Sequence, residues 1–152
     1  MIEIYDIKDC LDDLENVMDI IYEEWGKFFK TSKEEKISKI KRNIENNELF
    51  PKIYVLKENN IMVGSFTIKE YDLENSELSP WLACVIVEKS YRGKGYGNIL
   101  LKYIKNVIDR DYEKIHLFTN LDNFYEKINF KHLKNINHNG ELNKLYLYER
   151  EW

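Results

Sequence analysis

Cysteine is scarce in this chain, and its histidines follow no metal-binding pattern. The 152 residues include only Cys10 and Cys84, too few for a disulfide framework and without the spacing of metal ligands. The three histidines are His116, His132 and His138, and no two of them stand four residues apart as in a helical zinc motif. We therefore expect no disulfide framework and no bound metal.

The chain also lacks long apolar runs and an excess of positive charge. No stretch approaches the roughly 18 apolar residues of a membrane span, and the start has no basic segment followed by an apolar run, as a secretory signal would. The net charge of −4 argues against binding to a nucleic-acid backbone. Two prolines and six glycines leave no linker or repeat. We expect one cytoplasmic domain over residues 1–152, a monomer or homodimer, with no nucleic-acid or membrane partner.

The apolar pattern predicts short strands and amphipathic helices. Strands are expected over Ile2–Ile7, Ile53–Leu56, Ile61–Ile68, Val85–Val87, Lys114–Thr119, Phe130–Ile136 and Leu142–Tyr148. Helices are expected from Leu11 to Trp25, after the capping box Ser32–Glu35, and after the glycines near residue 95. This order predicts an α/β (α+β) fold in which a mixed sheet has helices on both faces.

The most informative stretch runs from Val85 to Leu101, VIVEKSYRGKGYGNILL. An apolar strand leads into a turn with three glycines, Gly93, Gly95 and Gly97, and a helix follows. Glycine lets backbone N–H groups crowd toward one target, and the helix dipole adds positive potential there. Arg92 and Lys94 add cations that suit phosphate oxygens. The pattern favours a phosphate-bearing ligand over an unliganded turn.

The spacing of these glycines excludes two common phosphate-binding motifs. A dinucleotide fingerprint is G-x-G-x-x-G, whereas these glycines form G-x-G-x-G. A P-loop lysine is followed by Ser or Thr, whereas Lys94 is followed by Gly95. A nucleotide-binding or oxidoreductase domain is therefore disfavoured.

Two segments resemble the GCN5-related N-acetyltransferase (GNAT) superfamily. Arg92, Gly95 and Gly97 fill its acetyl-CoA motif, and the segment Leu117–Phe130, LFTNLDNFYEKINF, is similar to its second motif. Asn129 stands where that motif usually has glycine, and asparagine tolerates a positive φ. The resemblance implies a mostly antiparallel sheet with splayed central strands, a variable part over 1–50 and an acetyl-CoA-binding core over 80–130.

The resemblance also implies which residues bind the donor, acetyl-CoA. The pantetheine arm would pair with the central strand, and the pyrophosphate would rest on the glycine loop. The expected donor-binding residues are Val85, Ile86, Val87, Arg92, Gly93, Lys94, Gly95, Tyr96, Gly97, Asn98 and Asn120. Tyr125 matches the general acid that protonates the departing thiolate. Asn120 fits a helix cap equally well.

The implied activity is transfer of an acetyl group from acetyl-CoA to a primary amine of a small molecule or peptide, by direct attack in a ternary complex. The acceptor is expected to meet Trp25, Asp72, Glu77 and Trp81, and the acid-rich interval Tyr71–Ser79 would suit a cationic acceptor. Trp25 fits a core role equally well. No general base is assigned, because carboxylates near the central strand and water are both candidates. The alternative function is a non-catalytic acyl-CoA sensor, which would not need Tyr125.

Overall fold

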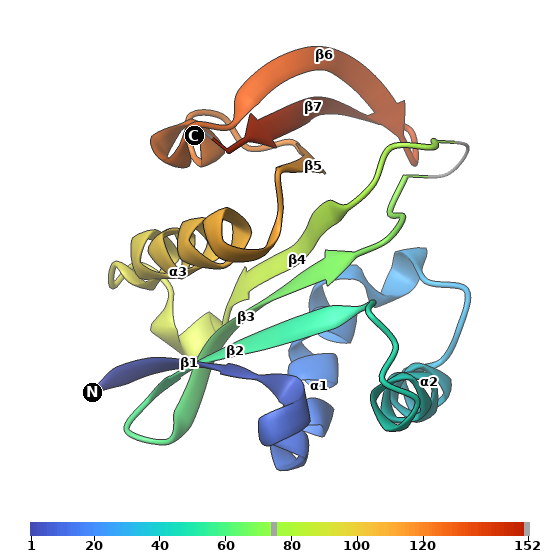
Figure 1. The fold of residues 1–152 in the computed structure, drawn as a ribbon, viewed down its shortest axis with the longest axis vertical. Helices are drawn as coiled ribbons and strands as arrows, with labels where there is room; N and C mark the ends of the chain where they lie inside the picture. The colour runs from blue at the N-terminus through green and yellow to red at the C-terminus, as the bar shows by residue number, and fades with distance from the viewer. Residues whose placement is uncertain (74–75, 151–152) are drawn as a thin grey trace.

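The computed structural model describes residues 1–73 and 76–150, which contain one seven-stranded sheet in the order β1-β2-β3-β4-β5-β7-β6 (Figure 1). The strands are β1 (Ile2–Asp6), β2 (Lys52–Glu58), β3 (Ile61–Lys69), β4 (Trp81–Val87), β5 (Lys114–Thr119), β6 (Lys131–His138) and β7 (Glu141–Glu149). The helices are α1 (Leu14–Trp25), α2 (Lys33–Glu45) and α3 (Tyr96–Asp111), with 3₁₀ turns η1 (Ile7–Asp9), η2 (Leu11–Asp13), η3 (Gly26–Phe28), η4 (Lys89–Tyr91) and η5 (Tyr125–Ile128). None of the described helices is long and apolar enough to cross a membrane.

Local sequence signals explain where several elements begin and turn. The Ser32 hydroxyl accepts a hydrogen bond from the Glu35 N–H at 3.1 Å, which sets the start of α2. Asn59 and Asn60 have φ of 52° and 67° and join β2 to β3, because asparagine tolerates the left-handed region that a two-residue hairpin turn needs. The first helix begins three residues later than Leu11, since residues 11–13 form the 3₁₀ turn η2.

The helices cover both faces of the sheet, as predicted (Figure 1). Side chains alternate along β2, so Tyr54 and Leu56 join α3 in one apolar cluster, while Ile53 and Val55 join α1 and α2 in another. A strand that is buried on both faces has a continuous run of apolar residues. For this reason β2 shows little alternation of apolar and polar residues in its sequence.

The two central strands separate soon after they meet. Every strand pair is antiparallel except β4 and β5, which run parallel and pair only at Trp81 and His116. The His116 N–H donates to the Pro80 carbonyl at 3.0 Å just at this junction. Beyond it, residues 82–87 have no strand partner in β5 within the described part of the chain. The predicted splayed centre of the sheet is therefore confirmed.

A bulge in β4 changes which side chains face each layer. Thr67 pairs with Ala83 and Ser65 with Ile86, so two residues of β4 stand opposite one of β3. Cys84, inside this bulge, has φ of 52°, an uncommon conformation for a residue other than glycine. As a result, Cys84 and Ile86 face α1 and α2, whereas Val85 and Leu82 face α3.

The buried His116 at the junction between β4 and β5 should make the stability of the protein depend on pH. His116 is buried against Trp81, and burial lowers its pKa below the ordinary 6.5. The unfolded chain takes up a proton near pH 6.5 that the folded form resists, so this part of the stability is complete above that pH and is lost as the pH falls through it. We expect urea denaturation to show a smaller loss of stability on acidification for His116→Phe than for wild type.

The exposed His132 on β6 provides the control for this experiment. His132→Phe removes a histidine without changing the junction, so it should lose more stability on acidification than His116→Phe does. All other titratable groups are common to the three proteins, and equal pH dependence of His116→Phe and wild type would contradict the prediction.

Candidate functional site

The loop between β4 and α3 is open above its glycines. It begins at η4, where the Glu88 carboxylate accepts a hydrogen bond from the Ser90 N–H at 2.9 Å. Gly93 and Gly95 have φ of 78° and 89°, in the left-handed region that favours glycine. A Cβ atom built at either glycine would meet nothing within 4 Å. The chain therefore requires glycine here for its backbone conformation, and the space beside it can admit a ligand.

This loop presents a continuous run of unpaired backbone donors. From Gly93 to Asn98, no backbone N–H donates to a residue that the structure describes, and α3 begins its own hydrogen bonding when the Ile99 N–H donates to the Gly95 carbonyl at 3.4 Å. The last four donors of the run are those that any helix N-terminus leaves unpaired, whereas Gly93 and Lys94 add two more. Such donors at the positive end of a helix dipole suit a phosphate group.

The side chains of the loop are held mainly by the surrounding protein. Arg92 Nε donates to the Val87 carbonyl at 2.9 Å, and its guanidinium lies 3.5 Å from the Glu24 carboxylate of α1. The Tyr96 hydroxyl donates to Glu58 at the end of β2. Arg92 and Tyr96 therefore brace the loop against β4, α1 and β2, and the backbone of the loop is its main anion-binding surface.

Lys127 is a basic residue near this loop that the sequence analysis did not select. Its Nζ donates to the Asn98 side-chain oxygen at 3.1 Å, which brings a cation from η5 to the first turn of α3. Its place two residues after Tyr125 in the second motif was the available signal. Lys94 supplies a further cation, with Nζ 5.7 Å from the centre of the Tyr91 ring.

Tyr125 lies in η5 and is almost completely buried. Its ring is 7% exposed and packs edge-on against Phe124 and Phe130. Burial raises the pKa of the phenol well above its ordinary value, and a charge on the nearby Cys84 would raise it further. The hydroxyl makes no hydrogen bond with a described residue, so a protonated donor is available at neutral pH. Asn129, with φ of 71°, ends η5 in the left-handed conformation for which its residue type is suited.

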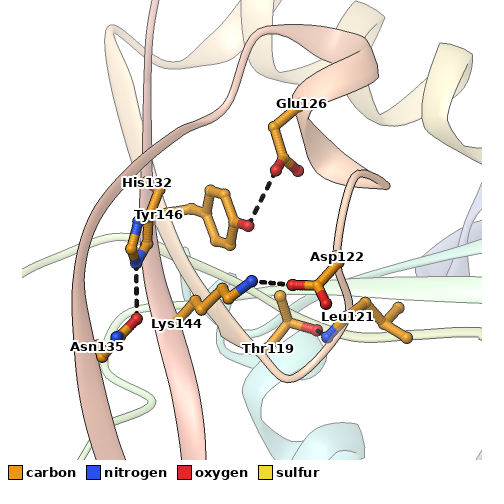
Figure 2. A network of polar contacts seen from close by, with 8 residues as sticks. All are labelled: Thr119, Leu121, Asp122, Glu126, His132, Asn135, Lys144 and Tyr146. Carbon is orange, nitrogen blue, oxygen red and sulfur yellow. Dashed lines mark hydrogen bonds and ion pairs between the residues drawn. The ribbon is translucent and has the colours of Figure 1, made fainter.

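A polar network fixes the segment that carries Tyr125 against β7 (Figure 2). The Tyr146 hydroxyl donates to Glu126 at 3.1 Å, and Lys144 pairs with Asp122. Figure 2 shows both contacts: Tyr146 joins β7 to Glu126 of η5, and Lys144 joins β7 to Asp122 of the segment between β5 and η5. Asn120 is exposed directly after β5, and the N-cap of η5 is Phe124, so Asn120 does not cap this short helix.

A cavity of about 450 Å³ lies between the helices α1 and α2 and the strands β2 to β4. Part of its lining is apolar and includes Ile21, Phe29 and Ile53. Cys84 reaches this cavity from the β4 bulge and is also close enough to Tyr125 to influence its pKa. The cavity lies on the face of the sheet covered by α1 and α2, whereas Tyr125 belongs to the apolar cluster on the α3 face.

None of the four residues predicted to meet the acceptor lines this cavity. Trp81 is completely buried and its indole N–H donates to the Leu78 carbonyl at 2.6 Å, a placement that favours packing over ligand contact. Trp25 is half-buried at the end of α1, in the apolar cluster with α2. Asp72 lies 3.3 Å from Lys69, and Glu77 is exposed. Glu74 of the same acid-rich interval lies outside the described residues.

The side chains that do line the cavity were missed by the sequence analysis. They include Cys84 and the lysines Lys36, Lys39 and Lys69. Their spacing in the sequence gives no signal, because the two lysines of α2 meet the one of β3 only after the helix packs on the sheet. Within residues 1–73 and 76–150, no three His, Cys, Asp or Glu side chains gather as metal ligands would.

Comparison with known families identifies the loop and η5 as parts of one domain type. The profile of the acetyltransferase (GNAT) domain matches residues 51–132, more than half of the chain. The chain belongs to the GNAT acetyltransferase family. The matched stretch runs from β2 to the start of β6 and contains the glycine loop, the splayed strands and Tyr125. Membership of this GNAT family supports acetyl transfer as the general activity.

Solved structures share the complete GNAT fold. An N-acetyltransferase from Staphylococcus aureus Mu50 is 19% identical over 98% of both chains, with a TM-score of 0.70. The protein yncA from Salmonella typhimurium, solved with its cofactor acetyl-CoA, is 12% identical over 99% of this chain and 94% of its own, with a TM-score of 0.71. RimL, a ribosomal alpha-N-protein acetyltransferase in complex with coenzyme A, is 15% identical over 98% and 94%, with a TM-score of 0.68. No curated protein matches significantly in sequence.

Proposed function

We propose that this protein transfers the acetyl group of acetyl-CoA to a primary amine within a ternary complex. The observation that carries the proposal is the position of the unpaired N–H groups of Gly93–Asn98 beside the gap between β4 and β5. The pyrophosphate would lie on those N–H groups, with the pantetheine arm along the unpaired edge of β4. Arg92 already occupies the Val87 carbonyl, so the arm would pair with groups of residues 82–86 that point toward β5.

The chemistry would take place at the gap between β4 and β5, with the cavity on the α1 and α2 face of the sheet and Tyr125 on the α3 face. A neutral amine attacks the thioester carbonyl, and a backbone N–H of β4 stabilises the resulting oxyanion. Attack forms the C–N bond, and collapse of the oxyanion then breaks the C–S bond while the Tyr125 hydroxyl gives its proton to the departing thiolate. Because burial raises the pKa of Tyr125, the phenolate recovers a proton readily, and the acceptor nitrogen supplies one through water.

Three carboxylates near the central strand, none of which the sequence analysis assigned as the base, are engaged or exposed in the structure. Glu88 caps η4, Asp72 pairs with Lys69, and Glu77 is exposed away from the cavity lining. These placements favour deprotonation of the acceptor ammonium by water. A non-catalytic acyl-CoA sensor would need the glycine loop but neither the buried phenol nor the cavity, so the site supports an enzyme better.

Isothermal titration with acetyl-CoA, followed by release of free thiol in the presence of amines, tests this proposal. We expect micromolar binding, a free energy of about −8 kcal/mol, and thiol release that depends on the amine. Binding without release from any amine would favour the sensor. Absence of acetyl-CoA binding would contradict both functions, because both require the glycine loop.

A further inference from the structure

The cavity beside Cys84 carries an excess of positive charge. Lys36 and Lys39 of α2 face it from one side and Lys69 of β3 from the other. Among residues 1–73 and 76–150, Glu70 is the one carboxylate in the lining. The acceptor side of the molecule is thus basic, although the protein as a whole has a net charge of −4.

Protein carboxylates neutralise this cluster only in part. The Lys69 ammonium lies 3.3 Å from the Asp72 carboxylate. Within residues 1–73 and 76–150, neither Lys36 nor Lys39 forms an ion pair. Burial lowers the pKa of Lys36, and the positive charges of Lys69 and Lys39 lower it further. An anion placed among these ammonium groups would compensate for the cost of burying their charge and for the repulsion between them.

We infer that the acceptor is an anionic amine, a small molecule whose primary amine is accompanied by a carboxylate or phosphate group that Lys36 and Lys69 bind. This inference rests on the proposed acetyl transfer. With the anion on the lysines, the amine points along the cavity to Cys84, where the donor's acetyl group would lie. Lysine suits either anion as a compact point charge. A polyamine would place like charges together, which disfavours the cationic acceptor expected from the sequence.

The size and lining of the cavity fit a small molecule. Its volume of about 450 Å³ lies within the range usual for small-ligand sites. Ile21, Phe29 and Ile53 provide apolar walls beside the lysines. The acceptor would therefore combine an anionic group, a modest apolar part and an amine.

Matched acceptor pairs test the inference by acetyl-CoA-dependent thiol release. One pair is ethanolamine and O-phosphoethanolamine, and the other is alanine and alaninamide, so the two arms separate phosphate from carboxylate. Because the members of a pair differ in amine pKa, the readout is the ratio of kcat/KM in a variant to that in wild type. For the anionic member of at least one pair, we expect this ratio to be about one tenth in Lys36→Gln and in Lys69→Gln. The loss should come mainly from a higher KM, as expected when a charge-assisted hydrogen bond is removed.

The uncharged members and the KM for acetyl-CoA should be unaffected by these substitutions. Lys41→Gln is the matched control, because Lys41 is an exposed lysine of the same helix that does not line the cavity. Lys36→Gln is the primary variant, since it breaks no ion pair and its folding should be normal. Equal effects on charged and uncharged acceptors, or none on either, would overturn the inference while leaving acetyl transfer intact.

Titration of inorganic phosphate into protein saturated with coenzyme A gives a readout independent of turnover. Because coenzyme A would occupy the glycine loop, phosphate binding would measure the anion affinity of the cavity lined by Lys36, Lys39 and Lys69. We expect binding that is lost in the Lys36→Gln, Lys69→Gln double variant and retained in Lys41→Gln. If that pattern holds while no amine releases thiol, the transferase proposal fails and the anion site stands. If phosphate binds and the double variant does not weaken it, or if phosphate does not bind and the alanine pair also shows no effect of the variants, the anion site is wrong.

Discussion

Replacing Gly95 with valine is expected to weaken acetyl-CoA binding by at least about tenfold, or 1.4 kcal/mol. Gly95 has φ of 89°, where a β-branched residue is strained, so valine would rotate the peptide groups that begin α3. Its side chain would also extend into the open space beside the unpaired N–H groups of Gly93–Asn98. Isothermal titration of the variant with acetyl-CoA measures the loss.

Gly140→Val is the control that separates loss of the site from loss of stability. Gly140 lies in the turn between β6 and β7 with φ of 78°, and a Cβ atom there also meets nothing within 4 Å. Valine is therefore strained in a similar way at both positions, at a cost of about 1–2 kcal/mol each. Gly140→Val should lose stability and still bind acetyl-CoA with unchanged affinity. Normal binding by Gly95→Val would show that the glycine loop does not hold the donor.

Much of the fold could be predicted because its signals are local. The strand predicted over Lys114–Thr119 has those bounds in the structure, and Ser32 caps α2 as its capping box indicated. The motif order also placed Tyr125 on a short helical turn between β5 and β6. Capping, turn formation and apolar periodicity each depend on residues close in sequence, so the sequence alone carries them.

The cavity proposed for the acceptor could not be predicted, because it depends on contacts between distant segments. The bulge at Cys84 arises from the register of β4 on β3, which apolar pattern alone does not specify. The lysines of the cavity come together only when α2 packs over β3. Trp81, which the sequence analysis placed near the acceptor, is completely buried in the structure.

Replacing Tyr125 with phenylalanine is expected to lower kcat by about 10²-fold or more, the usual contribution of general acid catalysis. The ring should keep its packing against Phe124 and Phe130, because only the hydroxyl is removed. Affinity for acetyl-CoA should therefore stay within about twofold of wild type, since an interaction made mainly in the transition state affects kcat and not ground-state binding. Thiol release at saturating donor and titration with acetyl-CoA measure the two quantities separately.

Tyr54→Phe provides the control for Tyr125→Phe. Tyr54 is another buried tyrosine, 6% exposed, whose pKa is also raised by burial, and it lies on β2 in the core beneath α3. Loss of its hydroxyl should affect stability and leave kcat unchanged. A kcat for Tyr125→Phe equal to that of Tyr54→Phe would assign Tyr125 to packing.

The pH profile adds a test that packing alone would not satisfy. Because burial raises the pKa of Tyr125, its proton remains available at alkaline pH, and loss of the general acid should cause no fall in kcat below about pH 10. The rate should instead rise with pH until the bound acceptor amine is neutral and then level off. A fall in wild-type kcat near pH 8 that disappears in Tyr125→Phe would mean that the phenol ionises far more easily than its burial allows, and the assignment of Tyr125 as a protonated donor would be wrong.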